Sequence, residues 1–164
     1  MDYVNAPGVD LVHDLNDGKL PFPDNSVQEV YASHVFEHLV HWEDVIMEVF
    51  RVLEPGGILT VRVPHGRGKG AYLAIHLRVF MPNTMDSLIL EPVRKVPSYH
   101  RAGMYSIQPF PRFECVSKRI VRHIPFEWHI QHHLGIDMTE GFYIGPPCEI
   151  VWVLRKPVTE GPIT

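Results

Sequence analysis

The segment Glu48–Pro64, EVFRVLEPGGILTVRVP, constrains the fold of this 164-residue chain more than any other. Its first part carries apolar residues at helical spacing, and Pro55 ends this helix because proline cannot continue the backbone hydrogen-bond ladder. Gly56 and Gly57 then allow the positive φ angles of a tight turn. Ile58–Val63 is mostly apolar and β-branched, which predicts a strand covered on both faces.

The composition fits one globular domain. The length suits a single core, and 45% of the residues are apolar. No apolar run reaches the roughly 18 residues of a membrane span, and no signal peptide is evident. Cys115 and Cys148 are predicted to be reduced thiols in a cytoplasmic protein, with a single bridge between them as the alternative. A net charge of −4 argues against a large nucleic-acid surface.

Alternating apolar patterns predict strands and helices in turn along the chain. We expect strands at Val9–His13, at Val27–Ala32, at Ile58–Val63, within Arg112–Trp128 (centred on Ser117–Pro125) and at Glu149–Leu154. We expect helices at Val35–Leu39, Glu43–Leu53, Ala71–Phe80 and Asn83–Leu90. This alternation favours a mainly parallel sheet, with the last two strands as an antiparallel hairpin at one edge.

Several ordered motifs resemble class I methyltransferases, which use S-adenosylmethionine. They are the helix–PGG–strand unit, an aspartate followed by an LPF turn in Val9–Pro23, the E-H segment in Val27–Leu39, and HLRVF at His76–Phe80. The similarity covers roughly Val9–Val63, and a weaker similarity extends to Leu90. It implies an α/β, Rossmann-like three-layer sandwich in a single domain, residues 1–164. Within it we expect a cofactor-side core (1–64), a substrate-side loop and helices (65–116) and edge strands (117–156).

The glycine-rich loop that usually opens this family's fold is not found in the sequence. Tyr3-Val4-Asn5 matches the middle of a G-Y-V-N-I-D segment, but Ala6 stands where the ribose-binding acid would be. The first strand is therefore expected to be missing, which would expose two strand edges. A homo-oligomer, a donated strand, closure of the flanking strands, or a start codon internal to the true gene would each account for this.

The resemblance implies a cofactor site at Asn5, Asp14, Leu15, Ser33 and His34. Asp14 and Leu15 match the positions that hold adenine, and Ser33 and His34 border the methyl-donor cleft. The alternative for Asp14 is a loop-capping aspartate. His34, Glu37 and His38 are the candidate catalytic residues, because a histidine titrates near neutral pH and can act as a base. The alternatives are a hydrogen-bonded structural histidine and a helix-start network.

Basic residues after the core predict a substrate-side surface. His65–Gly70, HGRGKG, could bind an anion through backbone amides and cations, although it lacks the P-loop pattern. The candidate substrate-binding residues are His65, Arg67, Lys69, His76 and Arg78. The basic clusters Arg62–Lys69, Arg94–Arg101 and Lys118–His123 could serve an anionic substrate or form a solvated face.

A zinc hydrolase is the remote alternative. His34 and His38 fit the pattern H-x-x-E-H, in which two histidines on one helix face hold zinc. His129, His132 and His133 form a second histidine cluster. The position of the first pattern between a strand end and a PGG turn argues against a hydrolase, so no metal is predicted.

The sequence thus predicts an S-adenosylmethionine-dependent methyltransferase that acts on a small-molecule or other acceptor. A non-catalytic, truncated relative that serves as a subunit or self-associates is the competing hypothesis.

Overall fold

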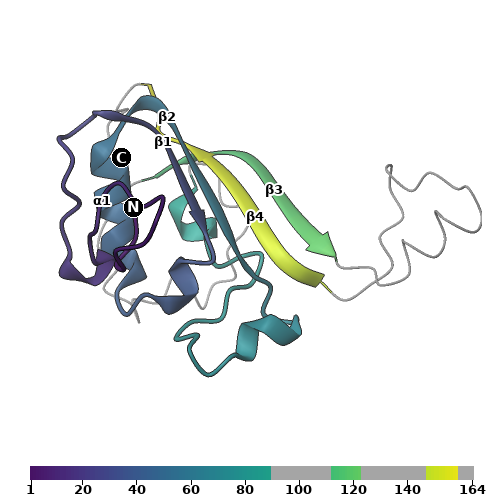
Figure 1. Cartoon of the computed structure of the whole chain (residues 1–164). Helices are drawn as coiled ribbons and strands as arrows, with labels where there is room; N and C mark the ends of the chain where they lie inside the picture. The colour runs from purple at the N-terminus through teal and green to yellow at the C-terminus, as the bar shows by residue number, and fades with distance from the viewer. Residues whose placement is uncertain (90–111, 123–146, 159–164) are drawn as a thin grey trace, which may run out of the picture.

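The computed structural model describes residues 1–89, 112–122 and 147–158, and its central element is a four-stranded mixed sheet (Figure 1). The strands are β1 (Val27–Ser33), β2 (Leu53–Pro64), β3 (Glu114–Arg122) and β4 (Pro147–Arg155), in the spatial order β1-β2-β4-β3. β1 and β2 are parallel, whereas β4 is antiparallel to both β2 and β3. The α/β class and the antiparallel edge are confirmed. Parallel pairing is limited to β1 and β2 among the described strands, so this part of the sheet is less parallel than predicted.

Helix α1 (Trp42–Val52) covers one face of the sheet (Figure 1). Its buried residues Val45, Ile46, Val49 and Val52 follow helical spacing and form the apolar stripe that joins the core. The helix was predicted at Glu43–Leu53, so its position is confirmed within one residue at each end.

Only one face of β2 is fully buried. Leu59, Val61 and Val63 are completely inaccessible, while the residues between them are partly exposed. This period of two is expected when a strand contacts a core on one side only. The prediction that β2 is covered on both faces is wrong for the described residues, because no described helix lies on the opposite face.

The Pro-Gly-Gly segment lies inside β2 rather than before it. Val27 of β1 pairs with Leu53, but Glu29 pairs with Ile58, so the intervening residues of β2 form an irregularity in the ladder. The predicted tight turn is therefore a bulge within one long strand. It lets the chain pass from α1 into the sheet without a separate loop.

Two glycines fit this bulge for different reasons. Gly56 has φ +86°, a conformation that L side chains rarely adopt. A Cβ on Gly57 would lie 2.8 Å from the Glu54 carbonyl oxygen and 3.1 Å from that of Gln28. The backbone of Lys156 holds the bulge in place. Its carbonyl oxygen accepts from Gly56 N and its N donates to Gly57 O, both at 2.9 Å.

Several predicted elements are shorter or absent. Val9–His13 forms no strand, and its contact with the chain start is an isolated bridge between Asp2 and Val12. The other three predicted helices, apart from α1, are present only as single 3-10 turns. These turns are η2 (Phe36–His38), η3 (Lys69–Tyr72) and η4 (Asp86–Leu88).

The segment predicted as a helix at 71–80 is extended after η3 because its backbone bonds to other elements. Leu77 N donates to Glu37 O at 2.8 Å, and Gly66 N donates to Phe80 O at 2.7 Å. Tertiary contacts therefore override the local helical pattern here.

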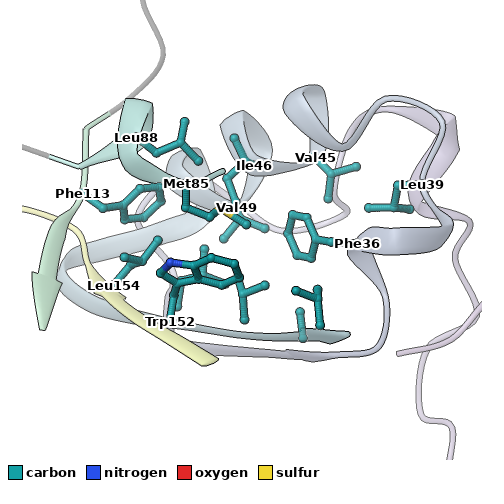
Figure 2. Packing of buried hydrophobic residues seen from close by; sticks show 14 of the residues in the cluster. Phe36, Leu39, Val45, Ile46, Val49, Met85, Leu88, Phe113, Trp152 and Leu154 are labelled. Atoms are coloured by element: carbon teal, nitrogen blue, oxygen red, sulfur yellow. The ribbon is translucent and has the colours of Figure 1, made fainter. Parts of the chain in front are cut away.

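Large side chains from distant segments fill the core between α1 and the sheet (Figure 2). Trp152 of β4 and Phe36 of η2 are almost fully buried, with Phe113 and Leu88 at the other end of the cluster. Phe80 lies 6.5 Å from Trp152 by ring centroids, and Trp42 connects Phe80 (5.7 Å) to Phe36 (6.4 Å). These contacts fix the loop after β1 against the sheet.

No helix in the described ranges is both long and apolar enough to cross a membrane. The clusters Arg94–Arg101 and His129, His132 and His133 lie outside the described residues.

Candidate functional site

The carboxyl ends of β1 and β2 lie side by side because the two strands are parallel. Ser33, the last residue of β1, is in register with Arg62 of β2. His34 follows at once, and its backbone N donates to Arg62 O at 2.8 Å. His34 has φ +54°, which is uncommon for a residue other than glycine and is found at functional sites more often than elsewhere. The open end of an α/β sheet is also where ligands bind.

The His34 ring lies between two carboxylates. Its Nδ1 is 3.2 Å from Glu37 Oε1, and its Nε2 is 3.0 Å from Glu149 Oε1. Both ring nitrogens of His34 therefore face carboxylate oxygens. The imidazole side chain is 42% exposed, whereas Glu37 is buried. His34 is thus held from inside and is reachable from solvent.

Arg62 completes this network by binding Glu149. Its Nε donates to Glu149 Oε2 at 2.8 Å, and its Nη2 donates to the same oxygen. Burial raises the pKa of Glu149, but hydrogen bonds from Arg62 and His34 outweigh it and leave the pKa below its ordinary value. Glu149 is therefore ionised at neutral pH. We call Glu37, His34, Glu149 and Arg62 the carboxylate–histidine network.

The third candidate catalytic residue, His38, has no side-chain hydrogen bond to His34 or Glu37 in the described part of the chain. Its Nδ1 donates to the carbonyl of Ile75 at 3.1 Å, and its ring stands edge-on to His76 with centroids 4.7 Å apart. Glu37, His38 and His76 nevertheless present potential ligand atoms within 4.8 Å of one another. His34 belongs to a different set, so the two histidines of the H-x-x-E-H pattern do not face one metal position.

The candidate substrate residues divide into two groups. His65 and Arg67 line a shallow hollow of about 320 Å³ together with Arg122 and three apolar residues. His65 is buried, and its Nδ1 accepts from Arg67 N at 2.9 Å. Burial lowers the pKa of His65, and the positive charges of Arg67 and Arg122 lower it further. The hollow is thus lined by a neutral imidazole and two arginines.

His76 and Arg78 do not line this hollow. They lie on the extended segment beside η2, where Arg78 Nη2 donates to Val40 O at 2.7 Å. Lys69 begins η3, at the end of the loop that carries Arg67. Of the predicted substrate residues, His65 and Arg67 line the hollow, whereas His76 and Arg78 lie on the segment beside η2.

The predicted adenine residues lie on η1 (Leu15–Asp17). Asp14 is the N-cap, and its Oδ1 accepts from Asn16 N at 2.8 Å, which is the capping role considered as the alternative. Asn16 Oδ1 accepts from Val40 N at 3.1 Å, so the turn is tied to the chain between η2 and α1. Leu15 packs against the core, and Asn5 is exposed.

Glu149 was missed as a site residue by sequence reasoning, and Arg62 was noted only as part of the basic cluster Arg62–Lys69. Glu149 is a charged residue at the start of an otherwise apolar strand, EIVWVL, and this was the available signal. Because β4 is antiparallel to β2, Glu149 pairs with Pro64 at the carboxyl end of β2.

Comparison with known proteins shows that part of this chain is similar to a known family. Residues 4–61 match the family model for the methyltransferase domain. A probable S-adenosylmethionine-dependent methyltransferase of Mycolicibacterium smegmatis is 44% identical over 59 residues, which cover 36% of this chain and 23% of that protein. A sterol 24-C-methyltransferase of Gibberella zeae is 51% identical over 43 residues, which cover 26% of this chain and 11% of that protein. The matches to the curated relatives thus span less than a quarter of their length.

Solved structures agree on the fold. A methyltransferase of Archaeoglobus fulgidus has a TM-score of 0.57 at 13% identity, over 89% of this chain and 66% of that one. The cyclase SpnF has a TM-score of 0.52 at 20% identity, over 91% and 57%. Residues 4–61 are thus similar to the methyltransferase domain family and to an S-adenosylmethionine-dependent member of it. The cofactor that this family implies is S-adenosylmethionine.

Proposed function

We propose that this chain binds S-adenosylmethionine at the carboxyl ends of β1 and β2 and transfers its methyl group to a small-molecule acceptor. The carboxylate–histidine network carries the proposal, because it places a solvent-reachable imidazole directly after β1 within the segment matched to methyltransferases. The identity of the fold alone would not suffice, since one fold supports several chemistries.

The residues at this edge fit the cofactor in chemical type. Asp14 is exposed and offers a carboxylate to the adenine amino group, while Leu15 beside it offers an apolar surface to the ring. Ser33 and His34 would lie at the sulfonium end. When bound, S-adenosylmethionine supplies an electrophilic methyl group.

His34 is suited to take the proton that an O–H or N–H acceptor loses. Glu37 holds Nδ1 from the buried side, which leaves Nε2 as the nitrogen that would meet the acceptor. In this structure Nε2 contacts the Glu149 carboxylate. When the acceptor replaces Glu149 at Nε2, Arg62 can keep the Glu149 carboxylate bound. The positioning of the acceptor supplies the rest of the rate enhancement.

The hollow beside His65 favours an anionic acceptor. Arg67 and Arg122 line it, and charge-assisted hydrogen bonds from arginine suit carboxylate and phosphate groups.

Calorimetric titration with S-adenosylhomocysteine tests the cofactor site. We expect saturable binding by the chain, weakened at least about tenfold in Asp14→Ala, because the variant lacks the carboxylate that receives the adenine amino group. The matched control is Asp10→Ala, which removes an exposed aspartate of the same segment and should bind like the unmodified chain. No binding at millimolar ligand, or equal weakening in both variants, would contradict the proposal.

A further inference from the structure

The carboxylate–histidine network leaves part of Glu37 unexplained. Glu37 is 1% exposed, and its Oε1 contacts His34. Its Oε2 is buried and has no hydrogen-bond partner in the described part of the chain. A buried carboxylate oxygen without a partner is costly, so it calls for a proton, a donor or a cation.

The imidazole of His76 has the same property. Its Nδ1 is buried and lacks a partner among the described residues. His76 lies on the extended segment that crosses η2, and Glu37 O fixes this segment by accepting from Leu77 N at 2.8 Å and Arg78 N at 3.2 Å. Two unsatisfied buried atoms, one acidic and one basic, thus come from elements that are bonded to each other.

His38 supplies a third atom with a defined tautomer. Its Nδ1 faces the carbonyl oxygen of Ile75 at 3.1 Å, and a carbonyl can only accept, so Nδ1 carries the hydrogen. The lone pair is then on Nε2. A backbone carbonyl on the second ring nitrogen is the usual arrangement of a metal-binding histidine, because it fixes both tautomer and orientation.

We propose that Glu37, His38 and His76 bind a zinc ion, with Oε2, Nε2 and Nδ1 as the ligands. Two imidazoles and a carboxylate form a set that zinc prefers, and three protein ligands leave a fourth position for water or another molecule. One potential ligand atom from each of the three residues lies within 4.8 Å of the other two. Ligands about 2.1 Å from zinc at a tetrahedral angle are about 3.4 Å apart, so side-chain shifts of about an ångström close the site.

This site differs from the zinc pattern in the sequence. That pattern pairs His38 with His34, but both ring nitrogens of His34 face carboxylates. In the proposed site His34 instead contacts the metal-binding carboxylate, and its role is to orient Glu37. The zinc ion joins η2 to the segment at 73–78 and satisfies both buried atoms. The inference does not depend on methyl transfer.

Zinc titration of the chelator-treated full chain tests the site. We expect one zinc ion per chain by calorimetry and a rise in the melting temperature on binding. His76→Gln and His38→Gln should each weaken binding by at least about 100-fold, since loss of a contact outside the ligand shell already costs 10–100-fold in other sites. Cobalt should bind the same site and show the visible absorption bands of tetrahedral coordination.

Two controls separate this site from other histidines. His41→Gln removes an exposed histidine whose side chain makes no capping hydrogen bond to α1, so zinc affinity should not change. The double variant His132→Gln/His133→Gln tests the histidine cluster noted in the sequence and should also keep the affinity. Circular dichroism of each metal-free variant verifies that it folds. Absence of binding at 0.1 mM zinc (about a hundredfold excess over a micromolar Kd), or loss of binding in the His132/His133 variant alone, would overturn the proposal.

Discussion

Replacement of Gly57 by alanine should destabilise the chain through a backbone clash. The new Cβ would lie 2.8 Å from the Glu54 carbonyl oxygen and 3.1 Å from that of Gln28. Ordinary contacts to a Cβ begin near 3.4 Å, so the closest approach is about 0.6 Å too short. Both oxygens belong to the backbone of paired strands, and neither can rotate away. Overpacking of this kind costs about 1–3 kcal/mol, a large part of the stability of a small domain.

Gly70→Ala is the matched control. Its Cβ would meet only Pro64 Cβ at 3.9 Å, and Gly70 has no positive φ. Alanine there should be neutral or slightly stabilising, because it restricts the unfolded chain. Gly56→Ala is a second comparison, since φ +86° should cost about 1–2 kcal/mol by conformational strain although no atom lies closer than 3.7 Å.

Urea unfolding followed by tryptophan fluorescence measures these differences. We expect Gly70→Ala to be about as stable as the unmodified chain. Gly56→Ala and Gly57→Ala should both unfold at lower urea concentrations. Equal midpoints for Gly57→Ala and Gly70→Ala would refute the close approach of Gly57 to the carbonyl oxygens of Glu54 and Gln28 at the bulge. That approach also sets the register that places His34 beside Arg62.

Two further predictions concern buried charge. Lys156→Met should lower the free energy of unfolding by about 2–4 kcal/mol in the same urea assay. The buried ammonium donates to three acceptors at 2.7–2.8 Å, and the variant would leave these acceptors unpaired. A loss below 0.5 kcal/mol, the size of an ordinary surface substitution, would contradict this reasoning. Stability should also fall as the pH drops through the folded-state pKa values of Glu48 and Glu149, which lie below the ordinary 4.5. Hydrogen bonds from Arg51 lower the pKa of Glu48, so the unfolded state binds more protons in this window and acid favours unfolding. Glu48→Gln should reduce the slope of unfolding free energy against pH below about pH 5, and an unchanged slope would count against the linkage.

The secondary structure around the PGG segment was predictable because its signals are local. The apolar spacing before Pro55 predicted α1 within one residue at each end, and the β-branched run after it predicted the second half of β2, which begins at Leu53 rather than Ile58. The helix expected at 71–80 was wrong, because hydrogen bonds to η2 and to the loop at 65–66 hold that segment extended. Such bonds depend on elements far apart in the sequence and leave no local pattern.

The site was predictable only in part for the same reason. The strand end at His34 follows from the order of strands and was found. Its partner Glu149 is 115 residues away, and the pairing arises from the antiparallel register of β4 on β2. Similarly, His38 was paired with His34 by sequence spacing, whereas folding brings it against His76. Side chains that meet across elements require the topology as well as the motifs.

Amide chemical shifts during titration with S-adenosylhomocysteine test the central claim most directly, because they locate the ligand on the chain. The account predicts saturable shifts at Asp14, Leu15, Ser33 and His34, at the carboxyl ends of β1 and β2. Residues at the opposite end of these strands, such as Ser26 and Gly57, should not move. Shifts confined to that opposite end, or no saturable shift at millimolar ligand, would contradict the assignment of this edge as the cofactor site.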